Sequence, residues 1–157
     1  MLLFLLLMAF QMGMLALQLD EERAMHMVFE LKHAVNRSAH AAAQQLDEAL
    51  LSQGIRSIDE ELAEVHMYRY LQANLRLDSD NHPLADSPLR SPIELAVFEV
   101  INADRTFPYR YVNTTYNYDV TLQRPGVVLI LRAEYPRMFR IIAPIVWTVK
   151  GTAELYP

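Results

Sequence analysis

The apolar run at residues 1–19, MLLFLLLMAFQMGMLALQL, constrains this chain more than any other feature. Only Gln11, Gly13 and Gln18 in it are not apolar. As a helix it would rise about 28 Å at about 1.5 Å per residue, which is close to the hydrocarbon thickness of a bilayer. Burying each large apolar side chain contributes roughly 1.5–3 kcal/mol. We therefore expect the run to lie in lipid or against other protein chains.

The start of the run also bears on its role. No Lys or Arg precedes the apolar residues, whereas a secretory signal peptide normally carries a basic segment there. We therefore expect the run to belong to the working protein, with Met1 either a start codon or a processed N-terminus.

Composition limits the remaining possibilities. The 157 residues, 52% of them hydrophobic, are enough for one compact domain with an appendage. The net charge of −5 offers no basic field for nucleic acid, so none is expected as a partner. The absence of cysteine excludes disulfides, thiolate metal sites and Cys-x-x-Cys-His haem attachment.

Helical periodicity continues beyond the apolar run. Apolar residues recur every three or four positions, as on one face of a helix: Ala24, Val28, Leu31, Val35, Ala39, Ala42, Leu46 and Ala49. Gly54 suits the left-handed position just past a helix end. The pattern predicts one helix of about fifty residues, which divides the chain into an N-terminal helix, 1–53, with a membrane or filament-core segment at 1–19, and a head, 54–157.

Two capping patterns predict short helices in the head. Ser57 and Glu60 have the spacing of a capping box, which predicts a helix from Ile58. Its expected core stripe is Ile58, Leu62, Val65, Tyr68, Leu71 and Leu75. The sequence Ser-Pro-Ile-Glu at 91–94 repeats the cap and predicts a second helix through Leu95, Phe98 and Ile101.

From Tyr109 onward the period changes to two, which is typical of strands. Residues 116–122 and 127–135 flank a turn at 123–126 and are predicted to pair as an antiparallel hairpin. Residues 146–155 alternate and predict a third strand with one buried face. The expected fold class is α+β: a long N-terminal helix with an apolar first third, two short helices and an antiparallel three-stranded sheet.

Three histidines share one helical face. His26, His33 and His40 lie seven residues apart, about 10.5 Å along a helix, so they cannot ligate one metal within a chain. The row lies opposite the apolar stripe, which favours a solvated or interfacial polar face.

Other candidate sites have structural explanations. Asp78-Ser79-Asp80 begins like a calcium loop, but Pro83 and Leu89 stand where that loop requires glycine and glutamate. The acidic residues at 59–64 fit the first turns of a helix, where they meet its macrodipole favourably. The chain has no Gly-x-Ser-x-Gly, phosphate-loop or His-Glu-x-x-His motif. We expect no enzymatic activity, no cofactor and no metal.

Two further patterns concern possible glycosylation and the placement of tyrosines. Asn36-Arg37-Ser38 and Asn113-Thr114-Thr115 fit the glycosylation tripeptide, and Asn113 is the one expected to be reachable. Tyr109, Tyr111, Tyr116 and Tyr118 fall on alternating positions, which is typical of sheet packing or of a subunit interface.

The order of these features resembles the TadE-like branch of the type IV pilin superfamily. An apolar N-terminus runs into an amphipathic helix with AHAAAQQL, and the chain closes with GVVLILRAEYP and IVWTVKGTAELYP. The resemblance implies cleavage by a prepilin peptidase before the apolar segment, with the helices bundled in a filament core and the heads outside. Leu5 stands where many type IV pilins have glutamate, so we expect helix register to rest on shape and on Gln11.

This resemblance implies a structural subunit of an extracellular cell-surface filament, held in the inner or cytoplasmic membrane before assembly. Expected partners are other copies of the chain, membrane lipid and the pilus-assembly machinery. The expected polymerisation core is Leu3, Leu6, Phe10, Met14, Leu17, Val28, Leu31 and Val35. The alternatives are a minor pilin-like membrane protein of an assembly or secretion machine, and a membrane-anchored binding module.

Overall fold

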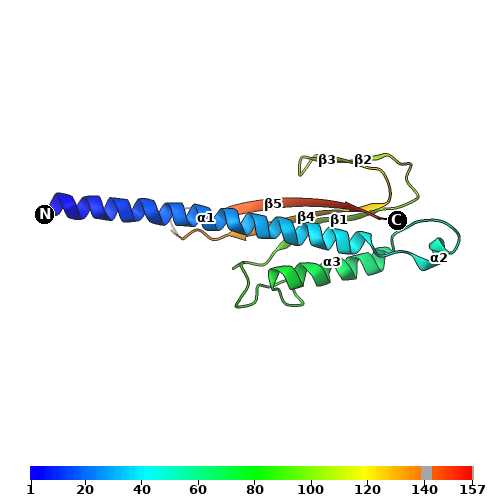
Figure 1. Cartoon of the computed structure of the whole chain (residues 1–157), viewed down its shortest axis with the longest axis horizontal. Helices are drawn as coiled ribbons and strands as arrows, with labels where there is room; N and C mark the ends of the chain where they lie inside the picture. Colours follow the sequence, from blue (N-terminus) through cyan, green and yellow to red (C-terminus); the bar gives the residue numbers. More distant parts are fainter. Residues whose placement is uncertain (139–142, 157) are drawn as a thin grey trace.

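The computed structural model describes residues 1–138 and 143–156 (Figure 1). Its elements are α1 (Leu2–Ala43), α2 (Glu48–Leu51), α3 (Glu60–Leu75), β1 (Glu94–Ile101), β2 (Tyr109–Asn113), β3 (Tyr118–Leu122), β4 (Gly126–Tyr135) and β5 (Ile145–Glu154). The α+β class is confirmed, with a long N-terminal helix, short helices and an antiparallel three-stranded sheet.

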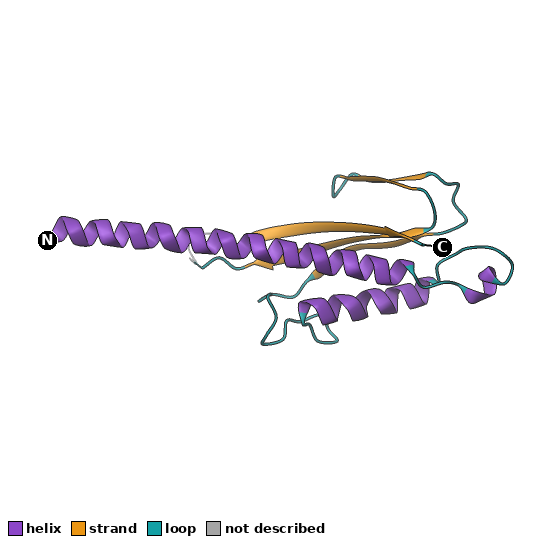
Figure 2. Ribbon diagram, viewed as in Figure 1, coloured by secondary structure: helices purple, strands orange, loops and turns teal. Residues whose placement is uncertain are grey.

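The head is layered around the C-terminal half of α1 (Figure 2). The sheet has the order β1-β4-β5, and all its pairs are antiparallel. Side chains of β4 alternate between its two faces, as in any strand. Val127, Leu129 and Leu131 face the core that contains α1 and α3, whereas Val128 and Ile130 belong to a second core under the hairpin of β2 and β3.

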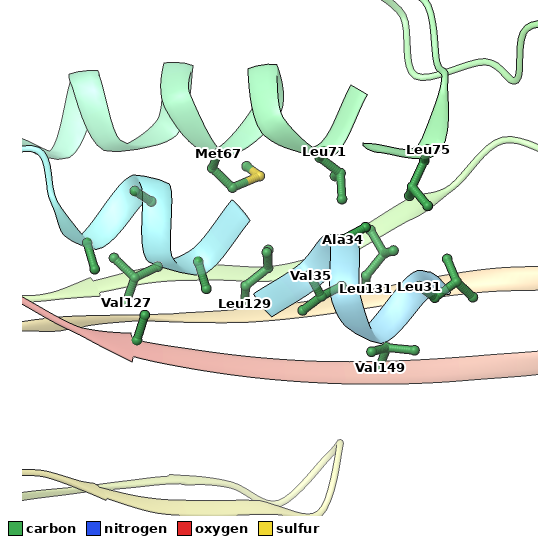
Figure 3. Close-up of a cluster of buried hydrophobic side chains, with 14 of the residues drawn as sticks. Leu31, Ala34, Val35, Met67, Leu71, Leu75, Val127, Leu129, Leu131 and Val149 are labelled. Carbon is green, nitrogen blue, oxygen red and sulfur yellow. The ribbon is translucent and has the colours of Figure 1, made fainter. Parts of the chain in front are cut away.

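The main core joins α1 and α3 to strands β4 and β5 (Figure 3). Leu31 and Val35 of α1 are fully buried, as are Leu71 of α3 and Leu129 of β4. Helix and sheet come unusually close at Gly151, where an added Cβ would lie 2.7 Å from Val35 Cγ1. A glycine is needed there because any side chain would push β5 away from α1.

The helix α1 is shorter than predicted, because it ends at Ala43 rather than near Ser52. The chain then turns outward, and Asp47 caps the separate helix α2 by accepting a hydrogen bond from the Leu50 N–H at 3.0 Å. The Asp47 N–H also donates to Ser57 O at 3.0 Å, which ties the two ends of this excursion together. Gly54 has the expected left-handed φ of 80°, but it follows α2.

The predicted cap of the next helix is also wrong. The cap of α3 is Asp59, whose carboxylate accepts from the Leu62 N–H at 2.9 Å, whereas Ser57 is buried before the helix. The buried face of α3 therefore consists of Ala63, Met67, Leu71 and Leu75. Of the expected stripe, Leu71 and Leu75 are confirmed, Ile58 is buried before the helix, Tyr68 is half-buried, and Leu62 and Val65 are exposed.

The helix predicted through Leu95, Phe98 and Ile101 is strand β1 instead. Proline at position 92 fits the start of a helix, but the residues that follow are rich in β-branched and aromatic side chains. Pairing with β4, from Glu94 with Arg132 to Ile101 with Gly126, satisfies their backbone groups. Tertiary pairing therefore overrides the local cap signal.

The predicted hairpin between residues 116–122 and 127–135 is likewise wrong. Strand β3 pairs with β2, from Tyr109 with Leu122 to Asn113 with Tyr118. The turn between them is local, since Asn113 Oδ1 accepts from the Tyr116 N–H at 3.2 Å and Asn117 has a φ of 47°. The alternating tyrosines do pack against the sheet: Tyr111 is buried in the second core, and Tyr109, Tyr116 and Tyr118 pack around it.

The predicted third strand is confirmed as β5. It pairs with β4 along its whole length, from Ile145 with Tyr135 to Glu154 with Gly126. Val149, Gly151 and Ala153 are buried on one face, and Leu155 continues that face beyond the strand.

Candidate site for membrane insertion and assembly

The N-terminal part of α1 projects beyond the head as a bare apolar rod (Figure 1). In the described part of the chain, α1 is the helix that is long and apolar enough to cross a membrane, by length and composition. None of the most apolar stretch of α1 is buried within the chain. Residues 2–19 rise about 27 Å as a helix, which is close to the thickness of the hydrocarbon core. The structure therefore presents a membrane-compatible surface that the described residues of the head do not cover.

The eight expected core residues divide into two groups along α1. Leu3, Leu6, Phe10 and Met14 are exposed, and Leu17 is half-buried. Val28 is half-buried against the head core, whereas Leu31 and Val35 are completely buried in it. The outer group is available to lipid or to another chain. Leu31 and Val35 are used within the subunit, because the sheet and α3 cover them.

A buried carboxylate marks the boundary between the bare rod and the head. Asp20 is 1% exposed, and its Oδ1 accepts hydrogen bonds from the Tyr135 hydroxyl at 3.0 Å and from the Met138 N–H at 2.9 Å. Arg137 Nη1 lies 3.8 Å from Oδ2. We call these four residues the Asp20 cluster. It fastens the chain just after β4 to α1 at the point where the helix leaves the head.

The carboxylate of Asp20 is shielded from water, and this affects the groups around it. Burial raises the pKa of Tyr135, and the hydrogen bond to Asp20 and the charge of that carboxylate raise it further. Asp20 Oδ2 and Arg137 Nε are buried without a hydrogen-bond partner among the described residues. Because they belong to opposite charges that already lie close, the ion pair offsets part of their desolvation.

Sequence reasoning missed the Asp20 cluster. One signal was present, since Asp20 is the first charged residue after the apolar run. The partners of Asp20 could not be inferred. They lie about 115 residues further along the chain, where the alternating apolar pattern indicates only that a strand ends.

The histidine row lies on an exposed face, as expected. His26, His33 and His40 are all exposed, and His26 Nδ1 lies 3.5 Å from a Glu30 carboxylate oxygen. Three adjoining hollows, of about 360, 370 and 590 Å³, follow this face from Asp20 to Gln45. The first two share Glu30 and the last two share Arg37.

The side chains of the candidate calcium loop and of the candidate glycosylation site form hydrogen bonds with nearby residues. The ligand atoms of Asp78, Asp80 and His82 lie within 4.8 Å of one another. However, Asp78 Oδ1 already accepts from the backbone N–H groups of Asp80 at 2.9 Å and His82 at 2.8 Å, so it stabilises its own turn. Asn113, the possible glycosylation site, is half-buried, and its amide nitrogen donates to the Tyr111 hydroxyl at 3.3 Å.

Together, the fold and the exposed helix define a class: an α+β head carried on a helix that can anchor it in a membrane. Comparisons with protein-family models, with curated protein sequences and with solved structures find no match for this chain.

Proposed function

We propose that the chain is a structural, non-enzymatic subunit of an extracellular pilus-like filament, polymerising through the apolar part of α1. Before assembly the same segment holds the subunit in the cytoplasmic membrane. The observation that carries this proposal is the bare segment at residues 2–19, which continues without a break into the helix at the centre of the head. The resemblance of the sequence pattern to TadE-like pilins supports the same reading.

The continuity of α1 between rod and head favours polymerisation. A membrane anchor alone needs only an apolar span, and a flexible linker would serve it. Here one helix of 42 residues forms both the rod and the centre of the core, and the Asp20 cluster fastens the head to it at the junction. A fixed angle between rod and head is what a helical polymer requires, because every subunit must present its head in the same orientation.

The partners follow from this assignment. Other copies of the chain cover Leu3, Leu6, Phe10 and Met14 in the filament, whereas lipid covers them before assembly. Transfer between the two surroundings requires pilus-assembly machinery, since an apolar segment of this length does not leave a bilayer unaided.

One observation favours a second candidate, a minor pilin-like protein that remains in the membrane. Leu31 and Val35 are buried within the subunit, so the head has a complete core without a neighbour. A polymer must then be held by the rod and by the surfaces of the heads.

Electron microscopy of material sheared from cells that make this chain distinguishes the two candidates. The filament proposal predicts helical fibres that are labelled by antibodies against the head. If the chain stays entirely in the membrane fraction and no labelled fibre is found, the filament assignment fails and the membrane-held candidate stands.

A further inference from the structure

The first of the three hollows, which we call the junction hollow, is lined by charges of both signs. Its volume of about 360 Å³ is within the usual range of small-molecule sites, roughly 300–1,000 Å³. Arg23 and Arg90 lie in its walls, and neither has an ion pair within the described residues. Glu30 lies there too, and its ion partner within the same residues is His26 at 3.5 Å, which carries charge only when protonated. The hollow therefore offers two guanidiniums and one carboxylate without a fixed opposite charge.

The junction hollow lies where the rod leaves the head. Asp20, which directly follows the apolar run, and its hydrogen-bond partner Tyr135 both line it. Arg90 comes from the same end of the sheet, because it lies just before β1, which starts opposite the end of β4. Arg137 offsets the charge of Asp20 from 3.8 Å, so Asp20 does not cancel the charge of the two arginines in the walls.

The level of the junction hollow along α1 matches that of lipid headgroups. If residues 2–19 occupy the hydrocarbon core, Arg23 lies about 6 Å beyond it, since it follows Leu19 by four residues. The headgroup layer extends roughly 5–8 Å outside the hydrocarbon on each side of a bilayer. Arg23 therefore begins within this layer. Glu30 lies two helical turns farther from the membrane, and helical side chains tilt toward the N-terminus, so that its carboxylate is directed back toward the layer.

The rod presents an apolar path directly below the junction hollow. Leu5, Met12 and Leu19 are spaced by seven residues, and Arg23 follows Leu19 by four, so all four lie on one face of α1. The three apolar side chains are exposed, and none of them is among the expected polymerisation-core residues. A molecule with a charged head and an apolar tail therefore finds matching surfaces in line with each other.

We propose that the junction hollow binds the headgroup of one phospholipid that carries a primary amine, the class of phosphatidylethanolamine. The phosphate lies between Arg23 and Arg90, because guanidinium groups bind phosphate oxygens with paired hydrogen bonds. The ammonium donates to the carboxylate of Glu30, and an acyl chain follows the apolar path below. This inference rests on the membrane-held stage of the proposed function and does not require polymerisation.

Glu30 makes the junction hollow selective among lipids that share a phosphate. A primary ammonium has three N–H donors for its carboxylate, whereas the trimethylammonium of phosphatidylcholine has none. Phosphatidylglycerol carries no cation, so its headgroup meets the charge of Glu30 uncompensated. A hydrogen bond between charged groups is strong enough to change affinity about tenfold. The order of affinity should therefore place phosphatidylethanolamine about tenfold above both.

Native mass spectrometry of the full chain in detergent tests this order. The three lipids are added in equal amounts with equal acyl chains, and the lipid retained by each chain is identified. We expect one phosphatidylethanolamine per chain. Arg23/Arg90→Gln should lose the bound lipid, and Glu30→Gln should lose the preference for phosphatidylethanolamine. The matched controls are Arg56→Gln and Glu48→Gln, which change exposed charges beyond the other end of α1 and should leave retention unchanged.

Three results overturn the inference. The natural chain could retain the three lipids equally, a measurement that needs no substitution. Retention could be unchanged in Arg23/Arg90→Gln. Water-soluble glycerophosphoethanolamine at equal concentration could displace the lipid completely, which would show that the apolar path contributes nothing and that the ligand is a soluble phosphate compound.

The result is separable from the proposed function. Filaments that form from a chain that retains no phosphatidylethanolamine would overturn the lipid site alone. Selective retention of this lipid, with no filament from any preparation, would instead support the lipid site and overturn the filament.

Discussion

The hydroxyl of Tyr135 donates a hydrogen bond to the carboxylate of Asp20 across 3.0 Å, joining the last residue of β4 to the turn of α1 where the bare rod meets the head. The same hydroxyl lies 3.3 Å from the backbone oxygen of Asp20. This contact fastens the end of β4 to α1 at the point where the apolar segment leaves the head. Its loss should weaken both the stability of the head and the geometry of any assembly.

Removing the carboxylate should be costly. We expect Asp20→Ala to lower the free energy of unfolding by roughly 2–4 kcal/mol, because the Tyr135 hydroxyl and the Met138 N–H lose their acceptor and the partly buried Arg137 loses its opposite charge. Tyr135→Phe should cost about 1 kcal/mol, as expected for one hydrogen bond. Urea unfolding of the full chain in detergent measures both. The exposed Glu22→Ala is the control, and a loss at Asp20 no larger than at Glu22 would refute the structural role.

High pH should weaken the same contact. The pKa of Tyr135 is raised above its ordinary value of 10.0 by burial and by Asp20, so the folded state holds the phenol proton more tightly than the unfolded state. The associated stability is fully present below about pH 10 and is lost as the pH rises through the higher folded pKa. Stability measured across this range should fall less steeply in Tyr135→Phe than in the natural chain. Identical slopes would show that Tyr135 does not titrate in this way.

The close approach of β5 to α1 makes Gly151 sensitive to substitution. A Cβ at this position would lie 2.7 Å from Val35 Cγ1 and 3.1 Å from Asn36 Oδ1. We expect Gly151→Ala to destabilise the head by about 1–3 kcal/mol through overpacking. Gly13→Ala is a matched control, since a Cβ there meets nothing within 4 Å and helix propensity favours alanine. The midpoint of thermal unfolding should therefore fall for Gly151→Ala and should rise or stay unchanged for Gly13→Ala.

Helix capping offers a test of the corrected start of α3. Asp59→Ala should cost about 0.5–2 kcal/mol, because it removes the acceptor for the Leu62 N–H. Ser57→Ala should cost little by comparison, since the Ser57 side chain has no hydrogen bond to the helix in the described structure. A larger loss at Ser57 than at Asp59 would restore the cap that the sequence predicted.

Signals in the sequence that depend on local chemistry are sufficient to predict part of this fold. The apolar rod, the alternation of β5 and the left-handed Gly54 depend on local chemistry, so they could be predicted. The strand at Leu95–Ile101 could not, because pairing with β4 outweighs the Ser-Pro-Ile-Glu cap signal. The predicted start of α3 was wrong for a related reason. Ser57 and Asp59 are both residue types that cap helices well, and tertiary contacts decide which of them does so.

The candidate functional residues also divide into those that the sequence could predict and those that it could not. Leu3, Leu6, Phe10 and Met14 could be assigned to an exposed apolar surface from composition alone. Periodicity also marks Leu31 and Val35 as apolar, but it cannot tell whether their partner is the same chain or another one. Asp20 and Tyr135 meet only after the whole sheet has formed, so no local pattern predicts their contact.

The most direct test of the central claim places a charge in the bare segment. Leu6→Asp puts a carboxylate among apolar neighbours, where it costs about 2.5–3.5 kcal/mol per subunit at the centre of a bilayer and a comparable amount in an apolar bundle. The matched control is Val112→Asp, which changes a side chain of similar exposure on the hairpin. Filament mass is measured by sedimentation and electron microscopy of sheared surface material, with the fold of the head checked by circular dichroism. We expect Leu6→Asp to abolish filaments with the head intact and Val112→Asp to leave them unchanged; normal filaments from Leu6→Asp would show that the apolar segment is not the polymerisation core.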